Sequence, residues 1–259
     1  MEKHEIAIQK FIDEMDYKEN EHVLGAFFYG SYLTGLYHDK SDIDMHIIVD
    51  DSNPYHLIRG NKWVDGFRIE YFEKPIHDLY LSIKNDFEIR SAAWKAIIGT
   101  SKILFDKNNQ LKQLQEYALE IYKQPLPKLS ENEAMERVSI LNNRMEKLEM
   151  FVHTPDFISL YYLTLEKIRK FYHDLSGLAK INTTKLSRIY NDEAYRMSYN
   201  GWEIPEEKFI SLYQDALYDV SSSNEVKLEK IKALYEYARR EISLGEDYRI
   251  PIKSRNLSR

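Results

Sequence analysis

Hydrophobic patterns typical of β-strands occur only in the first half of this 259-residue chain. Short apolar runs indicate buried strands, and strict alternation of apolar and polar residues indicates half-buried ones. Both patterns end before Gln124-Pro125-Leu126-Pro127, where two prolines in four residues cannot lie inside a helix. Beyond this point only helical spacings are found. The sequence therefore predicts an α+β fold, with a small mixed β-sheet domain over residues 1–125 followed by an all-α helical bundle over residues 126–259.

Individual elements can be placed from the same patterns. Residues 22–29 form a continuous apolar run, 42–49 and 66–73 alternate, and a short strand is expected at 102–105. Helices are expected, from apolar spacing, over residues 3–17, 86–98, 109–123, 130–152, 154–175, 184–197, 205–220 and 225–243. Ser130 followed by Glu133 is a capping box, which marks the start of one of these helices.

Composition narrows the classes of protein that the chain can represent. With 43% hydrophobic residues it can build a sizeable core, but no apolar run reaches the ~18 residues that span a bilayer. The charged N-terminus does not resemble a signal peptide. The absence of cysteine excludes thiolate metal sites and fits a reducing compartment, so we expect a cytoplasmic protein. A net charge of −6 argues against nucleic acid as a partner.

Acidic residues at alternate positions mark one face of the second predicted strand. Asp42, Asp44 and His46 share this face, while the intervening residues are apolar and belong to the core. On the third predicted strand Glu70 points the same way as its polar neighbour Arg68. If the two strands pair, Glu70 completes a cluster of three carboxylates. His46 is interpreted as a residue behind this cluster or as a solvated side chain, and not as a ligand.

A cluster of three carboxylates is unfavourable unless a cation offsets their mutual repulsion. Mg²⁺ takes oxygen ligands and is commonly held by one or two carboxylates together with substrate phosphates. Two such ions, roughly 3.5–4 Å apart, stabilise both the attacking and the leaving oxygen in phosphoryl transfer. The pattern therefore predicts a magnesium site, with two ions, at Asp42, Asp44 and Glu70.

Gly30 and Ser31 stand where the first buried strand turns toward a predicted short helix. A glycine at such a turn lets backbone N–H groups approach a phosphate closely. The serine hydroxyl adds a further donor.

Gly30-Ser31, ten intervening residues, Asp42-Ile43-Asp44 and the later Glu70 together resemble the DNA-polymerase-β-like nucleotidyltransferase superfamily. Within it, the sequence is most similar to the small bacterial nucleotidyltransferases that add AMP to aminoglycosides or related antibiotics. The motifs lie within about residues 23–73, and the segment from Trp94 to Leu111 also resembles the end of that catalytic domain. A helical second domain matches the family's plan as architecture.

The resemblance implies an enzyme that transfers a nucleoside monophosphate, with ATP as the donor and a small hydroxylated molecule as the acceptor. Gly30 and Ser31 would hold the triphosphate, Asp42 and Asp44 would ligate the metals, and Glu70 would complete the set. Glu70 replaces the aspartate common in the family, so its role as ligand or as base stays open. Lys185, near the start of a predicted helix, is a candidate for the triphosphate because lysines of this domain reach it in related enzymes.

A regulatory enzyme that adenylylates a partner protein, as in toxin–antitoxin pairs, is the alternative function. The helical domain of such systems is often a ribonuclease with an arginine and a histidine separated by four to six residues. Arg169 and His173 have only three residues between them, which disfavours the ribonuclease. A catalytically inactive nucleotide-binding protein is disfavoured by the intact set of acids.

Overall fold

The computed structural model describes residues 2–52, 54–55, 57–91, 93–198, 203–244 and 248–251. The chain groups into two compact units. One comprises Met1–Pro125 with Asp192–Trp202, and the other comprises Leu126–Asn191 with Glu203–Arg259. Every strand that the structure describes belongs to the first unit. Within the described residues, no helix is both long and apolar enough to cross a membrane.

A five-stranded mixed sheet, in the order β3-β4-β2-β1-β5, forms the centre of the first unit. The central pair β2 and β4 is parallel, and all other neighbours are antiparallel. The strands are β1 (Val23–Tyr29), β2 (Ile43–Val49), β3 (Ile58–Val64), β4 (Phe67–Pro75) and β5 (Lys102–Asp106). Together with the helices that cover the sheet, this arrangement confirms the predicted α+β class.

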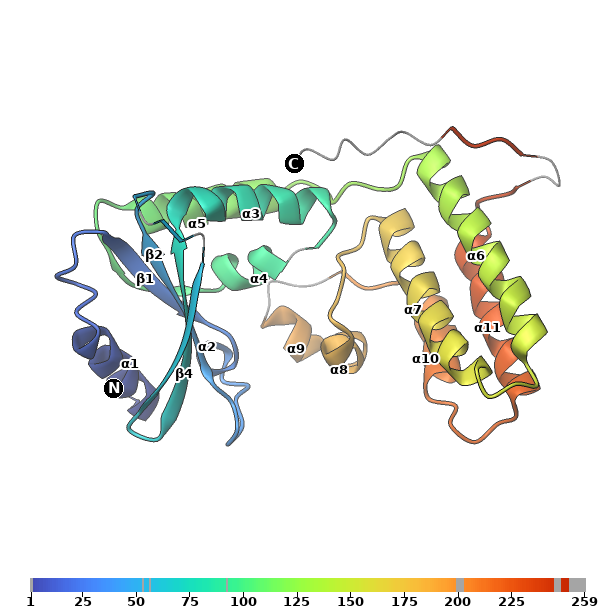
Figure 1. Cartoon of the computed structure of the whole chain (residues 1–259), viewed down its shortest axis with the longest axis horizontal. Helices are drawn as coiled ribbons and strands as arrows, with labels where there is room; N and C mark the ends of the chain where they lie inside the picture. Colours follow the sequence, from blue (N-terminus) through green and yellow to red (C-terminus); the bar gives the residue numbers. More distant parts are fainter. Residues whose placement is uncertain are drawn as a thin grey trace. The chain divides into compact units, whose positions relative to one another are not determined.

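Different helices cover the two faces of this sheet (Figure 1). On one face, α1 (Lys3–Glu14) packs its apolar residues against the inward side chains of β1, β2 and β4. The alternate residues of β2 predicted to be core are at most 3% exposed: Ile43, Met45, Ile47 and Val49. The remaining helices of this unit are α2 (Ser31–Thr34), α3 (Ile76–Glu88), α4 (Ala93–Gly99), α5 (Gln110–Tyr122) and α9 (Glu193–Met197).

Two parts of the first unit differ from the sequence prediction. Strand β3 was missed because its polar residues hide any alternation, and as an edge strand it needs few apolar side chains. The prediction of a single helix over 86–98 was wrong, because α3 ends at Glu88 and α4 begins at Ala93. The break lies at Arg90, whose φ of 61° is left-handed and cannot continue a helix.

Helices build the second unit: α6 (Glu131–Phe151), α7 (Phe157–Ser176), α8 (Leu186–Asn191), α10 (Glu207–Leu217) and α11 (Asn224–Arg239), with a 3₁₀ turn η1 (Thr183–Lys185). The predicted capping box is confirmed, since the Ser130 backbone N–H donates to the Glu133 carboxylate at 2.8 Å and the Ser130 hydroxyl caps the helix in return. The predicted single helix over 184–197 is divided into η1, α8 and α9. The Asp192 side chain interrupts it by accepting from the Tyr195 N–H at 2.9 Å.

Arg169 and His173 of α7 are core residues of the second unit. Arg169 is 1% exposed and forms a bidentate ion pair with Glu166. His173 is fully buried between the Ala179 carbonyl and the Tyr190 hydroxyl, each 2.8 Å away. Burial lowers the pKa of His173 to about 4, so the imidazole is neutral near pH 7. These two side chains therefore hold the bundle together and offer no exposed acid–base pair.

Candidate active site

The parallel pairing of β2 and β4 brings the predicted carboxylates together. Asp44 and Glu70 are direct partners in the register of the two strands, and Asp42 lies one residue before β2 begins. One carboxylate oxygen from each of the three side chains lies within 4.8 Å of the other two. All three side chains are half-buried, so they are accessible yet held by the sheet. The expected pairing of these strands is confirmed.

Two arginines contact the cluster. The Arg68 guanidinium donates to the Asp42 carboxylate at 2.7 Å, and Arg59 donates through Nε to Glu70 at 2.8 Å and through Nη2 to the same oxygen. These pairs offset part of the repulsion among three carboxylates. Strand alternation in the sequence placed Arg68 on the same face as Glu70, but its pairing with Asp42 was not predicted. Arg59 could not be found in the sequence, because it belongs to the unpredicted strand β3.

Tyr29 closes the cluster on the side of β1. It is the last residue of that strand and the register partner of Asp44. Burial raises the pKa of Tyr29 well above its usual range, and the negative charges of Asp44 and Glu70 raise it further. Its hydroxyl therefore stays protonated near pH 7 and can act as a neutral hydrogen-bond donor.

His46 lies two residues further along β2 than Asp44, on the same face. It is 5% exposed and stacks between the rings of Phe27 and Phe72, with centroid distances of 5.3 and 5.2 Å. Burial, with a smaller effect from Lys74, lowers the pKa of His46 to about 3. His46 is therefore a neutral ring packed behind the carboxylates. This agrees with a position behind the cluster and excludes the solvated side chain that the sequence also allowed.

Gly30 and Ser31 form the turn between β1 and α2, next to the carboxylates. Gly30 has φ 84° and ψ −154°, a backbone conformation restricted essentially to glycine. A β-carbon at this position would collide with the carboxylate of Asp44. Thr34 stabilises the turn, because its hydroxyl donates to the Gly30 and Ser31 carbonyls at 3.3 and 3.2 Å. Gly30 therefore permits a close approach between this turn and the cluster.

Replacing Gly30 by alanine should reduce transfer by at least roughly tenfold, because the new β-carbon displaces Asp44 in addition to straining the backbone. Steady-state transfer rates and thermal unfolding measure the two effects. Gly35→Ala is the matched control, since Gly35 also has a positive φ of 73° but nothing lies within 4 Å of its missing β-carbon. Equal loss of activity in both variants would contradict a specific role for Gly30.

The remaining predicted site residue, Lys185, is an exposed residue of η1 in the second unit. It is not part of the carboxylate cluster, which the first unit forms by itself.

The donor set of the cluster fits a hard divalent cation. Three carboxylates supply oxygen ligands only, at separations that one ion or a pair of ions can bridge. Asp42, Asp44 and Glu70 would hold such an ion, which would neutralise negative charge on a phosphate and on a displaced oxygen.

A mixed sheet that gathers three carboxylates beside a Gly-Ser turn is the arrangement expected of a metal-dependent phosphoryl-transfer enzyme. Residues 8–151, more than half of the chain, match the model of the nucleotidyltransferase domain family. The chain therefore belongs to this family, which confirms the resemblance to the DNA-polymerase-β-like superfamily, and it is a nucleotidyltransferase.

Among solved structures, the chain is similar to a nucleotidyltransferase-like protein from Exiguobacterium sibiricum 255-15. The two share 13% sequence identity with a TM-score of 0.49, over 92% of this chain and 75% of the other. No curated protein sequence matches the chain.

Proposed function

We propose that the protein transfers AMP from ATP to a hydroxyl of a small-molecule acceptor, with Mg²⁺ bound by Asp42, Asp44 and Glu70. The observation that supports this proposal is the convergence of the three carboxylates within 4.8 Å on an accessible face of the sheet. An aminoglycoside or a related antibiotic is the acceptor that the sequence resemblance favours.

In this reaction the acceptor oxygen forms a bond to the α-phosphorus. The bond between the α-phosphorus and the oxygen that bridges it to the β-phosphorus breaks, and pyrophosphate leaves. Bound Mg²⁺ would supply charge neutralisation on the phosphates. Asp42 and Asp44 would hold the cations, while Gly30 and Ser31 would donate to the triphosphate from the adjoining turn. The proton of the acceptor hydroxyl must pass to a base, and Glu70 is the proposed one, in addition to or in place of its role as a metal ligand.

The test is incubation of the protein with each α-³²P-labelled NTP, Mg²⁺ and a panel of aminoglycosides, lincosamides and candidate proteins. Label on a small acceptor, with ATP the best donor and with no transfer by Asp44→Asn, supports the proposal. Label on a protein would instead support the alternative regulatory function. Label on neither, with active-site nucleotide binding intact, would contradict both.

Lys185 is proposed to bind the triphosphate, in keeping with its place in the sequence resemblance. Lys185→Ala should then raise the KM for ATP by roughly tenfold, because a lysine–phosphate contact is charge-assisted, with a smaller effect on the acceptor. Initial-rate kinetics with each substrate varied separately measures this. Lys208→Ala, an exposed lysine on α10 of the same unit, is the control. If only the KM for the acceptor changes, Lys185 belongs to the other substrate.

A further inference from the structure

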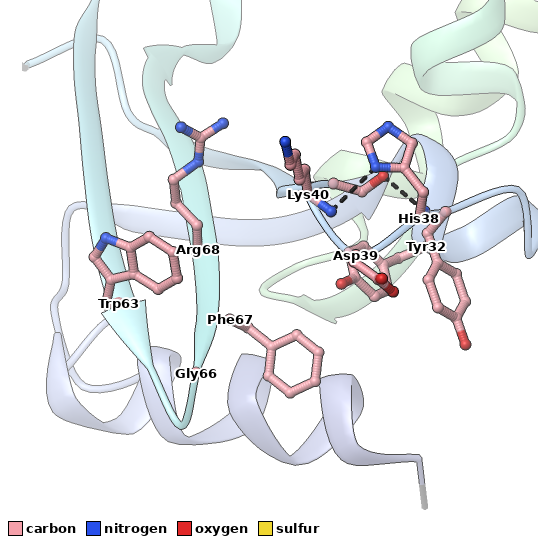
Figure 2. Close-up of a pocket in the computed structure, with 10 residues that line it drawn as sticks. Tyr32, His38, Asp39, Lys40, Trp63, Gly66, Phe67 and Arg68 are labelled. Carbon is pink, nitrogen blue, oxygen red and sulfur yellow. Dashed lines mark hydrogen bonds between the residues drawn. The ribbon is translucent and has the colours of Figure 1, made fainter.

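A pocket of about 550 Å³ opens between the β3–β4 hairpin on one side and α2 with the segment that follows it on the other (Figure 2). Tyr32 of α2 lines the pocket together with Tyr37 and Lys40 of the following segment, and Trp63, Phe67 and Arg68 line it from the hairpin. Both sides belong to the first unit. Nothing in the proposed function assigns a role to this pocket.

Aromatic side chains form much of its wall. Tyr32 and Tyr37 stack with their ring centroids 4.5 Å apart and their planes 9° from parallel, and Phe67 meets Tyr32 edge-on at 5.9 Å. Trp63, the register partner of Arg68 across the hairpin, is 69% exposed. A large aromatic residue left exposed beside a hollow has apolar area that a bound ring can cover. The wall therefore suits a ligand with a flat ring.

Positive charge predominates in the lining. Arg68 and Lys40 face a single acid, Asp39, whereas His38 accepts a hydrogen bond from the Lys40 backbone N–H through Nδ1 at 3.1 Å. Among the residues that the structure describes, no carboxylate pairs with Lys40, and in Figure 2 its amino group extends to the same side as the Arg68 guanidinium. Such a lining attracts an anionic group and repels a polycation.

Arg68 connects this pocket to the carboxylate cluster, because it lines the pocket and its guanidinium donates to Asp42 at 2.7 Å. A divalent cation bound at Asp42 competes with Arg68 for the same carboxylate, and close like charges repel. Once a cation occupies the cluster, Arg68 therefore loses its partner. Its charge then becomes available to an anion in the pocket.

We propose that this pocket binds an anionic, ring-bearing acceptor, and that a divalent cation at the carboxylates strengthens this binding by releasing Arg68 from Asp42. The inference rests on the proposed function. It favours an anionic acceptor over a polycationic aminoglycoside. In-line transfer places the acceptor and the leaving pyrophosphate on opposite sides of the reacting phosphorus. Gly30, assigned to the triphosphate, adjoins Asp44, whereas the pocket adjoins Asp42, so the pocket suits the acceptor side.

Isothermal titration calorimetry with benzenesulfonate, which scarcely binds Mg²⁺ in water, tests the inference without nucleotide or turnover. We expect benzenesulfonate to bind more tightly than neutral benzyl alcohol, and cationic benzylamine to bind least. Saturating Mg²⁺ should strengthen benzenesulfonate binding by about fivefold or more, the usual size of coupling between two sites. Tighter binding of benzylamine, or no effect of Mg²⁺, would overturn the proposal.

Two arginine variants separate the proposed coupling from direct binding of the anion to the cation. Arg68→Gln should lose most of the Mg²⁺ enhancement, whereas Arg59→Gln should keep it, because Arg59 pairs with Glu70 but does not line the pocket. Lys40→Gln should weaken benzenesulfonate about threefold whether or not Mg²⁺ is present. An enhancement in Arg68→Gln equal to that of the wild type would contradict the role of Arg68.

Electron paramagnetic resonance of Mn²⁺ distinguishes failure of this inference from failure of the proposed function. If Mn²⁺ binds but leaves benzenesulfonate binding unchanged, only the coupling is wrong. If Mn²⁺ does not bind, the metal site and the coupling both fail. Displacement of benzenesulfonate by a non-hydrolysable ATP analogue with Mg²⁺ would assign the pocket to the nucleotide and overturn the acceptor assignment. Simultaneous binding of both ligands supports it.

Discussion

Asp42→Asn and Asp44→Asn should each reduce nucleotidyl transfer by roughly a thousandfold or more. An amide is a poor ligand for a hard divalent cation, and preorganised charge at a phosphoryl-transfer site is worth several kcal/mol of transition-state stabilisation. The turnover number for labelled ATP and an identified acceptor measures the effect. Asp13→Asn is the control, since Asp13 is an exposed acid on α1, on the opposite face of the sheet. Activity within about tenfold of wild type in either variant would exclude the metal assignment.

Both variants should remain folded, which separates lost chemistry from lost structure. Removing one negative charge from a cluster of three relieves repulsion, and both side chains are half-buried, outside the hydrophobic core. Asp42→Asn also removes the ion pair with Arg68, but the Arg68 side chain is 43% exposed, so its guanidinium can be solvated. Circular dichroism and thermal unfolding should therefore resemble those of the wild type.

Thermal stability should rise by several degrees only when ATP and a divalent cation are present together. Without a cation, the carboxylates repel the triphosphate, and so the nucleotide cannot bind. When both bind, the native state gains about 2.7 kcal/mol at a ligand concentration one hundred times the Kd. Differential scanning fluorimetry with ATP, with Mg²⁺, and with both measures the shift.

The same experiment in EDTA and with Asp44→Asn provides the controls. Neither should show the shift that ATP and Mg²⁺ produce together in the wild type. A shift of equal size with ATP in EDTA would mean that the nucleotide binds without a cation, and the assignment of the three carboxylates as metal ligands would then be wrong.

The carboxylate site was largely predictable from the sequence because it depends on local patterns. Alternation along residues 42–49 indicated which side of the strand Asp42 and Asp44 occupy, and the apolar neighbours of Glu70, Ile69 and Tyr71, did the same for its strand. Their convergence required only that the two strands pair, which the parallel register confirms. Local periodicity was therefore sufficient to predict the face on which the three carboxylates lie.

What could not be predicted depends on contacts between distant segments. His46 shares the face of the two aspartates, yet it is buried because rings from β1, β4 and α4 surround it. Arg59 reaches Glu70 only because β3 pairs with β4, and β3 has no readable pattern. The interruptions at Arg90 and Asp192 likewise depend on single backbone or capping interactions, which average hydrophobic spacing does not detect.

The arginine partners of Asp42 and Glu70 have a consequence for the folding of the protein. A newly synthesised chain must bring three acids together at a stage when no ion has been bound. Because two of them have an internal counter-charge, the sheet can form without a bound cation. If the cluster binds a metal as proposed, folding and metal binding would then be separate events, and scarcity of the metal would leave the enzyme inactive but folded.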